Sequence, residues 1–336
     1  MNLSKTNHAI GVDIGGTTIK SGIVNHKGEI VFAGKALSTG LYSLPLDFVE
    51  ALYTSLAPAI KIVGIENIKG IGIGAPNGNI YRGTIEQAPN LPWKGVVPMA
   101  ALIAERFKLP CALTNDANAA AVGEMMYGAA IGMKDFIVLT LGTGVGSGIV
   151  ANGQLIYGHD GFAGELGHTF IRRGRKHWST GLDGSLEVYA SATGIGFTTR
   201  LFLKSSSKPS LLREFNVSDI DAKLVCDCAL KGDQLAQEVF EYTGQILGEA
   251  LANFIMVTSP EVIILFGGVT KAGDLLLTPT KEHMERNLLP IFQNKIQLIL
   301  SELKEADAAI LGASALVWGM KTEEHQKTKV FKELQF

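Results

Sequence analysis

Short apolar runs alternate along this chain with longer segments whose apolar positions recur every three or four residues. The short runs predict buried strands and the longer segments predict amphipathic helices. Predicted strands lie at 9–14, 20–24, 29–33, 69–74, 111–114, 136–141 and 261–266, with a hairpin turn at 25–28. Predicted helices lie at 47–63, where Pro58 is expected to break or kink the helix, at 98–107, 115–127 and 308–320, and helices dominate 219–257.

One pattern occurs twice. Residues 10–31 give a strand, a Gly/Thr turn, a second strand, a turn at Gly28 and a third strand, and residues 137–156 repeat this order with the last turn at Gly153. Two copies of one antiparallel unit predict two similar domains that face a shared cleft. The alternative is a chance likeness between two glycine-rich hairpins, because short strand motifs are degenerate.

The composition is that of a globular protein of about two domains. The chain has 336 residues, 46% hydrophobic and 18% charged, which excludes a disordered protein. The net charge of −2 argues against nucleic-acid binding, and no apolar run reaches the ~18 residues of a membrane span. Three cysteines form no disulfide framework and predict a reducing, cytoplasmic location. The 39 glycines predict tight turns and close approach of backbone to a ligand.

The turn after the first strand has the composition of an anion-binding loop. Backbone N–H groups around Gly15 and Gly16 can approach a phosphate closely, and Thr17 adds a hydroxyl donor. Asp13, at the end of the strand, can hold a hydrated Mg²⁺. Lys20 either supplies a cation or is a surface strand residue, and the sequence favours neither.

A second turn, in the other half of the repeat, offers the same chemistry. Two such turns facing each other suit a triphosphate across a cleft, whereas each alone is also consistent with a tight hairpin. The sequence contains neither the P-loop motif nor a G-x-G-x-x-G before a helix, so other common nucleotide folds are disfavoured. The residues of the second turn are Gly142, Thr143, Gly144 and Gly146.

Asn115 and Asp116 stand at a predicted junction between a strand and a helix. Both residue types favour the N-cap of a helix, and the motif by itself favours that interpretation. Asp116 is also a candidate general base, because carboxyl ends of strands face the crevice in which open α/β sheets bind ligands. There it can accept the proton of an attacking hydroxyl.

Several amide, carboxylate and imidazole side chains suit a polyhydroxylated ligand, since sugar hydroxyls need paired donors and acceptors. Glu165 and His168 are three residues apart and share one side if their segment is helical, although a surface or capping role for His168 is the alternative. The absence of H-E-x-x-H excludes a zinc protease. The whole set is Asn77, Asn90, Asn115, Glu165, His168 and Glu187.

Motifs at 13–20, 74–78, 88–93, 115–124, 141–148, 164–168 and 266–269 follow one another in a specific order. With them, about residues 8–320 resemble the ROK (repressor, open reading frame, kinase) family, most of all its bacterial glucokinase-like sugar kinases. The resemblance implies an α/β fold, namely the actin-like ATPase (ribonuclease H-like) fold, with two domains, an internal duplication and an interdomain cleft. Residues 1–115 are then the small domain, with helix 308–320 as a candidate to return to it, 116–307 the large domain, and 321–336 a polar tail.

The resemblance also implies roles for residues. Asp116 corresponds to the catalytic base for a sugar hydroxyl, which reverses the preference for a cap. The first turn, with Asp13, and the second turn correspond to the two phosphate motifs of ATP binding, and Gly267 and Gly268 to the adenosine side. The residues that correspond to sugar contacts are Asn90, Asn115, Glu165, His168 and Glu187. Asn77 stands where the family often has Gly, and it is a further candidate for a sugar contact.

One departure from the family concerns zinc. Many members bind zinc through the motif histidine and three cysteines, but Trp178, Thr180 and Ser185 stand at the cysteine positions here. Because structural Zn²⁺ is almost always four-coordinate, we predict no structural zinc. The C-x-C pair within 219–257 has no partnering histidine and does not replace the lost ligands. His168 then needs another support, such as a hydrogen bond or packing against Trp178.

The predicted function is transfer of the γ-phosphate of ATP to a hexose hydroxyl in the presence of Mg²⁺. The favoured reaction converts glucose to glucose 6-phosphate. Kinases for fructose, mannose, allose or N-acetylmannosamine are alternatives. A non-catalytic sugar-sensing regulator is the alternative outside the enzymes, although the first strand, at Ala9, is expected to leave no room for a DNA-binding module. Hexose and ATP are the expected partners, without nucleic acid or membrane, and the resemblance implies a homodimer.

Overall fold

The computed structural model describes residues 7–320. The chain divides into two compact units, one formed by Met1–Met126 with Ala306–Phe336 and the other by Tyr127–Glu305. Each unit contains a mixed sheet. The tail predicted at 321–336 lies outside the described residues.

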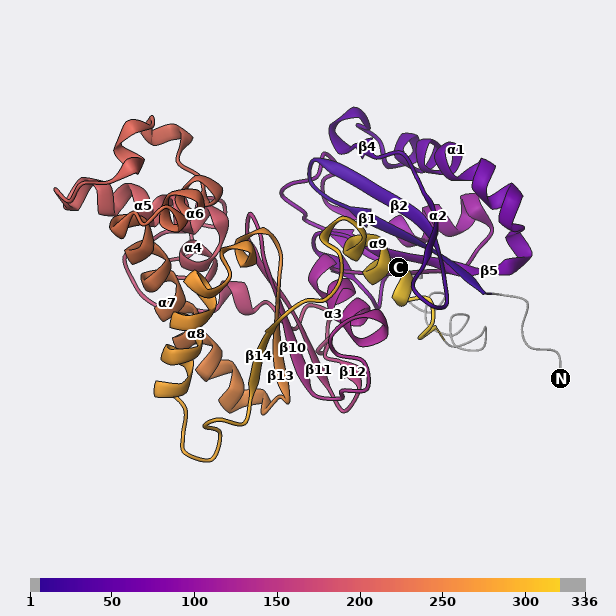
Figure 1. Cartoon of the computed structure of the whole chain (residues 1–336). Helices are drawn as coiled ribbons and strands as arrows, with labels where there is room; N and C mark the ends of the chain where they lie inside the picture. Colours follow the sequence, from indigo (N-terminus) through magenta and orange to yellow (C-terminus); the bar gives the residue numbers. More distant parts are fainter. Residues whose placement is uncertain (1–6, 321–336) are drawn as a thin grey trace. The chain divides into compact units, whose positions relative to one another are not determined.

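The sheet of the first unit has the strand order β3-β2-β1-β5-β9, with β4 also paired to β2 (Figure 1). Strands β1 to β3 are antiparallel, whereas β1, β5 and β9 run parallel. Register pairs Asp13 with Gly74 and Gly74 with Thr114, so the carboxyl ends of three strands meet at one edge. The strands are β1 (His8–Ile14), β2 (Thr18–Asn25), β3 (Ile30–Ala33), β4 (Leu37–Ser38), β5 (Ile68–Gly74) and β9 (Cys111–Thr114).

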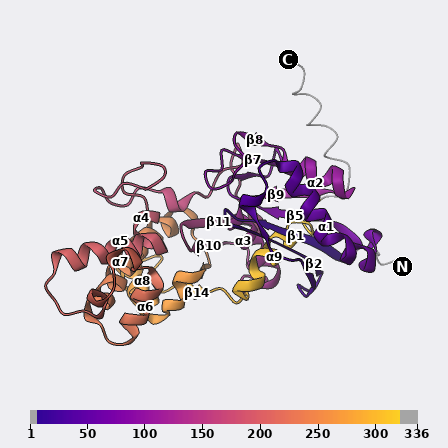
Figure 2. The ribbon, with the colours of Figure 1, turned by 90° about the horizontal axis from the view of Figure 1, so that it is seen from above.

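Helices cover both faces of this sheet. Ile10 and Val12 join one apolar core with residues of α1 (Pro45–Val63) and α2 (Met99–Phe107), and α1 continues through Pro58 rather than breaking there. Successive strand residues point to opposite faces. Gly11 and its register partner Gly72 accordingly face α9 (Glu305–Ala315), on the side of the sheet away from α1 (Figures 1 and 2).

The first unit extends past the boundary predicted at residue 115, because α3 (Asp116–Tyr127) packs on its sheet and on α9. A Cβ on Gly74 would lie 3.3 Å from the Ala119 methyl carbon, and one on Gly312 of α9 would lie 2.6 Å from the Ala119 carbonyl oxygen. The sequence prediction also missed a small antiparallel sheet of β6 (Gly78–Asn79), β7 (Thr84–Glu86) and β8 (Val96–Val97).

The sheet of the second unit repeats the arrangement of the first, which gives the sequence repeat its structural basis. Its order is β12-β11-β10-β13-β14, with β10 to β12 antiparallel and β10, β13 and β14 parallel. The short edge strand β14 was not predicted, because half-exposed residues give it no clear alternation. The strands are β10 (Phe136–Leu141), β11 (Val145–Ala151), β12 (Gln154–Leu155), β13 (Val262–Phe266) and β14 (Gln297–Leu300).

Helices of the second unit enclose a large apolar core. Two glycines let α7 approach α8 closely, since Gly244 and Gly248 lie against Pro279 and Met284 of α8. Only the region of α6 and α7 was predicted as helical. The helices are α4 (Glu187–Ala190), α5 (Ala192–Ser205), α6 (Ala222–Leu230), α7 (Gln234–Thr258) and α8 (Asp274–Arg286).

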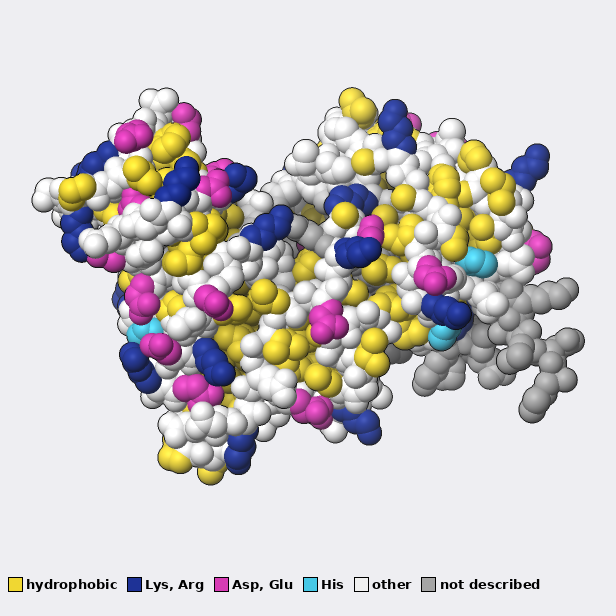
Figure 3. All heavy atoms as spheres, viewed as in Figure 1, with side chains coloured by type: hydrophobic (Ala, Val, Ile, Leu, Met, Phe, Trp, Pro, Cys, Tyr) yellow, Lys and Arg dark blue, Asp and Glu magenta, His cyan; other side chains and the backbone are white. Residues whose placement is uncertain are grey.

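Two further features of the described residues are the distribution of charge on one face and the apolar character of the helices. On the face drawn in Figure 3, Lys and Arg side chains are scattered among Asp and Glu side chains rather than gathered into one broad basic area. Within residues 7–320, no helix combines the length and the apolar character that crossing a membrane requires.

Candidate functional site

The first glycine turn, between β1 and β2, is tied to a neighbouring threonine. Thr39 Oγ1 donates a hydrogen bond to the Gly15 carbonyl at 2.7 Å, and the Thr39 N–H donates to the Thr17 carbonyl at 3.0 Å. Gly16 and Thr17 are exposed, and a Cβ on Gly16 would lie 3.0 Å from the Asn90 Cβ. The fold therefore holds the turn open to a ligand and brings Asn90 beside it.

Asp13 is the residue before the last one of β1 and lies directly beside this turn, and its strand partner on β2 is Lys20. Burial, and then the negative charge of Asp116, raise the pKa of Asp13 to about 7, while the positive charge of Lys20 acts in the opposite direction. Lys20 is thus a half-buried cation facing a carboxylate rather than a simple surface residue.

The pair of carboxylates fits a divalent cation. Two neighbouring carboxyl groups with raised pKa values would both gain from a positive charge, and carboxylate oxygens are the ligands that Mg²⁺ prefers. Asp13 is the residue that would hold a hydrated Mg²⁺ bound with a nucleotide.

Asn115 and Asp116 divide between them the two roles that the sequence left open. Asn115 Oδ1 accepts the Asn118 N–H at 2.7 Å, so Asn115 is the residue that caps α3. Asp116 is the first residue of the helix, and its Oδ1 accepts the Ala117 N–H at 2.8 Å. The helix end therefore has its cap without Asp116.

Asp116 is exposed, and its surroundings still affect its ionisation. Desolvation by the surrounding protein raises the pKa of Asp116, while hydrogen bonds from the backbone of Ala117 and of Asp116 itself act in the opposite direction. A carboxylate that is both accessible and raised in pKa is suited to accept a proton.

Asn77 follows β5 with a positive φ of 51°. Its Nδ2 donates to the carbonyls of Glu86 and Gln87 at 2.9 and 3.3 Å, which ties this loop to β7. A contact of Asn77 with a sugar would therefore use its Oδ1.

The second glycine turn, between β10 and β11, is built like the first. The Gly142 N–H donates to the Gly144 carbonyl at 3.0 Å, and Thr193 Oγ1 donates to the Thr143 carbonyl at 3.0 Å. The Gly146 N–H donates to Thr140 Oγ1 at 3.2 Å. Threonine side chains thus brace both turns from the side.

The predicted adenosine residues lie next to the second turn within the same unit. Strand β13 runs parallel to β10 with Phe266 beside Thr140, so both strands end at one edge. Gly267 follows with φ of 110°, and a Cβ there would lie 2.6 Å from the Leu141 carbonyl oxygen. Only glycine fits this conformation and spacing, and Gly268 beyond it is exposed.

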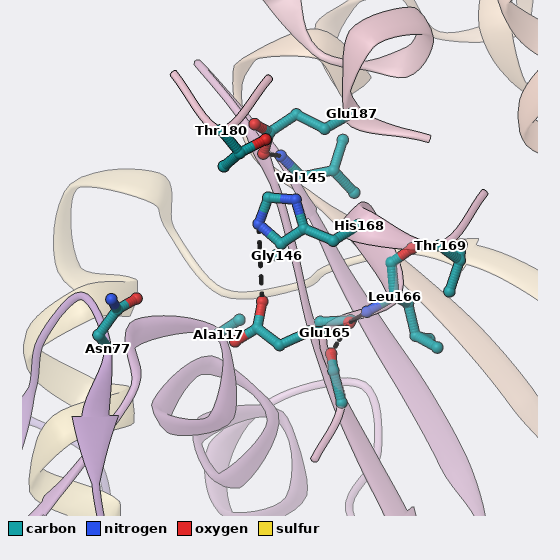
Figure 4. A network of polar contacts seen from close by, with 12 residues as sticks. Asn77, Ala117, Val145, Gly146, Glu165, Leu166, His168, Thr169, Thr180 and Glu187 are labelled. Carbon is teal, nitrogen blue, oxygen red and sulfur yellow. Dashed lines mark hydrogen bonds and ion pairs between the residues drawn. The ribbon is translucent and has the colours of Figure 1, made fainter. Parts of the chain in front are cut away.

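The predicted sugar residues of the second unit lie around the start of β11 (Figure 4). Glu165 precedes the short 3₁₀ helix Leu166–His168, and His168 Nε2 lies 3.9 Å from Glu165 Oε2. Glu187 begins α4, and its Oε2 accepts the Val145 N–H at 2.7 Å. The structure thus attaches Glu187 to the strand that leaves the second glycine turn.

The sequence analysis missed one residue of this group, His177. Its side chain is only 3% exposed, and its Nε2 is hydrogen bonded to Glu187 Oε1. The rings of His177 and His168 meet edge to face with centroids 5.7 Å apart, whereas Trp178 stacks on His177 at 4.2 Å. Packing of Trp178 against His168 was one support considered from the sequence, but in the structure Trp178 stacks on His177 instead. The available signal was a histidine directly before the first replaced cysteine position.

The side chains around His168 do not fit a structural zinc. Ligand atoms of His168, His177 and Glu187 lie within 4.8 Å of one another, and His168 Nδ1 is buried without a hydrogen-bond partner. However, His177 Nδ1 accepts the N–H groups of Ser179 and Thr180 at 3.2 and 3.1 Å, so the proton of the neutral ring lies on Nε2. A protonated nitrogen offers a metal no lone pair, and this group supplies fewer than four ligands.

Comparison with known proteins identifies the relatives of this chain. Residues 9–319 match the model of the ROK family. A glucokinase of Halalkalibacterium halodurans is 36% identical over 332 residues, covering 95% of this chain and 97% of that protein. A glucokinase of Thermotoga maritima is 35% identical, covering 92% and 96%. A xylose repressor of Caldicellulosiruptor bescii is 31% identical, covering 92% of this chain and 77% of the repressor.

The fold agrees with these relatives. The structure of a ROK family glucokinase from Streptomyces griseus, in complex with glucose and AMPPNP, matches with a TM-score of 0.76 and 31% identity, covering 92% of this chain and 98% of that one. The predicted actin-like ATPase fold is confirmed. The order of the motifs, the duplicated sheet and the match over nearly the whole length lead to one conclusion: this chain belongs to the ROK family.

Proposed function

We propose that this protein is an ATP-dependent sugar kinase that transfers the γ-phosphate of ATP to a hexose hydroxyl, with glucose as the first candidate. The observation that carries the proposal is the junction of β9 and α3. Asn115 caps the helix there, and Asp116 presents an exposed carboxylate of raised pKa beside Asp13. The glucokinase names of two relatives that match over nearly their whole length, and the glucose and AMPPNP complex of a third, support it.

In the proposed reaction Asp116 accepts the proton of the sugar hydroxyl as its oxygen attacks the γ-phosphorus. The bond from this phosphorus to the bridging oxygen breaks, and ADP leaves. Backbone N–H groups of the two glycine turns stabilise the charge of the phosphates, with Gly267 and Gly268 at the adenosine. Mg²⁺ bound with ATP would neutralise part of that charge, held through water by Asp13.

In this proposal the sugar hydroxyls are bound by amide, carboxylate and imidazole side chains. Their amides and carboxylates offer the paired donors and acceptors that hydroxyl groups need. The set is Asn77, Asn90, Asn115, Asp116, Glu165, His168 and Glu187.

Several expectations about the whole protein stay predictions. They are a homodimer, a cytoplasmic location, no binding of nucleic acid and no structural zinc. Fructose, mannose, allose and N-acetylmannosamine stay alternative acceptors, and a sugar-sensing regulator stays the alternative outside the enzymes.

The test is a coupled assay of ADP release with Mg-ATP against a panel of hexoses and N-acetylhexosamines. We expect turnover of glucose, and Asp116→Asn is expected to lower kcat at least ~100-fold while sugar binding, measured by calorimetry, is retained. Asp47→Asn is the matched control, because Asp47 is also an exposed acid in the first turn of a helix of the same unit.

Two outcomes would contradict the proposal. Near-normal turnover of Asp116→Asn would leave that residue without the role of base. Silence of the wild type with every sugar, together with measurable sugar binding, would favour the regulator.

A further inference from the structure

His177 is a buried titratable residue to which the reaction proposed above assigns no role. It lies in the loop between His168 and Glu187, and this loop is held in place on both sides. Lys176 forms a β-bridge with Asp183, and the Asp183 carboxylate accepts the N–H groups of Gly174 and Arg175 at 2.9 and 3.0 Å.

The same loop is anchored in the core through Arg175. The buried Arg175 guanidinium donates to the Val188 carbonyl and to Thr198 Oγ1, both at 2.9 Å. The His177 N–H donates to the Leu182 carbonyl at 2.8 Å, so the backbone of His177 is fixed as well.

Hydrogen bonds also fix the ring of His177. Its Nδ1 accepts the N–H groups of Ser179 and Thr180, and such an acceptor nitrogen carries no proton. Nε2 is then the protonated nitrogen, and it donates to Glu187 Oε1. The imidazole is therefore a donor of fixed position and direction, aimed at one carboxylate oxygen.

Glu187 is held from its other side by the second glycine turn. Its Oε2 accepts the Val145 N–H at 2.7 Å, and a Cβ on Gly144 would overlap this same oxygen. Each oxygen of the carboxylate thus has one donor from the protein, and its plane is set before any ligand arrives. A carboxylate oxygen can accept more than one hydrogen bond, so both oxygens keep capacity for hydroxyl donors.

We propose that His177 is a positioning residue that orients the Glu187 carboxylate for sugar hydroxyls, and that it does so without a metal ion. The inference rests on the proposed sugar kinase activity. His177 also packs edge to face on His168, so one side chain supports two predicted sugar residues. A hydrogen bond to a charged group that fixes a binding residue is expected to change affinity about 10-fold to 100-fold.

The test compares three substitutions of His177 in the full-length protein. His177→Leu removes the donor and should raise the sugar KM about 10-fold to 100-fold, while the ATP KM changes less than about threefold. His177→Gln can place an amide N–H where Nε2 lies, and it should restore most of the affinity. His177→Asn is too short to reach Glu187 and should resemble His177→Leu.

The chain offers a matched control in a second histidine–glutamate pair of the same unit. His283 Nε2 lies 3.3 Å from Glu241 Oε1, and neither residue belongs to the predicted site. His283→Gln should leave both KM values unchanged. If His177→Leu does not fold, the order of His177→Gln above His177→Asn in sugar affinity carries the test.

The outcomes separate this inference from the proposed function. A wild type with neither turnover nor sugar binding would refute the kinase, and this inference with it. A wild type that turns over sugar, beside His177 variants with unchanged sugar KM, would overturn the inference alone. So would about one zinc per chain that is lost in His177→Gln, because the metal rather than the hydrogen bond would then orient Glu187.

Discussion

Asp13 and Asp116 form a carboxylate pair whose partners are more than one hundred positions apart in the chain. The parallel register of β1, β5 and β9 brings them together, because these three strands end at one edge. The result is a local excess of negative charge, countered within the unit by Lys20. Such a pair favours a bound cation, and it lowers the stability of the folded protein when no cation is present.

The pH dependence of stability should report this pair. The pKa of Asp13 is about 7 in the folded protein and near 3.8 in the unfolded chain, so the folded state retains a proton that the unfolded state loses. The stabilisation from the neutral carboxyl is fully present below about pH 4 and is lost as the pH rises toward and through 7.

Asp13→Asn cannot ionise and should escape this loss. We expect the melting temperature of the variant, relative to that of the wild type, to be higher at pH 8 than at pH 5, both measured without Mg²⁺. Equal differences at the two pH values would mean that the pKa of Asp13 is not raised.

Asn115 combines a capping role seen in the structure with a predicted sugar contact, and substitutions can separate the two. Asn115→Ala loses the cap, which costs about 1 kcal/mol and about 2–4 °C in melting temperature. Asn115→Asp keeps a capping oxygen and should keep the melting temperature, but it replaces the amide donor and should raise the sugar KM. An unchanged KM in both variants would remove Asn115 from the sugar site.

At the scale of elements, a pair of glycines decides how α9 meets the sheet. Gly11 and Gly72 are register partners on β1 and β5, and a Cβ on either would overlap carbonyl oxygens of α9, at Ile310 and Ala313. The helix thus lies directly on the backbone of two strands. This close approach returns the end of the described chain to the first unit.

Gly72→Ala should therefore displace α9. We expect a destabilisation of about 1–3 kcal/mol, the usual result of overpacking, measured by thermal unfolding. Gly40→Ala is the control, because Gly40 lies in the same unit and a methyl group added to it would meet no described heavy atom within 4 Å. Equal melting temperatures for the two variants would contradict the tight contact.

On the scale of the whole molecule, the two units share a sheet order but carry different chemistry. The first holds the carboxylates Asp13 and Asp116, and the second holds His168, His177 and Glu187. The sequence analysis predicts no structural zinc in this second group, because other residues replace the three cysteines, and a hydrogen bond joins His177 to Glu187 there.

Removal of metal ions should distinguish a dependence on structural zinc from a dependence on Mg²⁺ bound with ATP. After treatment with a zinc-selective chelator and dialysis, the melting temperature and the activity with added Mg-ATP should match those of untreated protein. The same activity should be absent without Mg²⁺. A loss of stability that only zinc restores would refute the prediction of a zinc-free protein.

The sequence by itself determined the features that depend on neighbours along the chain. The repeat of strand, glycine turn and strand predicted the duplicated sheet, and the Asn115–Asp116 junction predicted a helix start with two candidate roles. Periodicity and turn chemistry are local, so one sequence suffices to read them. The helices α4, α5 and α8 were not predicted from the sequence.

The tertiary structure alone decided which distant residues meet. It placed Asp116 beside Asp13, gave the cap to Asn115, and turned His177 toward Glu187. These outcomes follow from strand register and from loop anchoring by buried hydrogen bonds, which no spacing along the chain encodes. Helix α3 belongs to the first unit for the same reason. Its Ala119 lies against Gly74 of β5 and Gly312 of α9, which are far from it in the sequence.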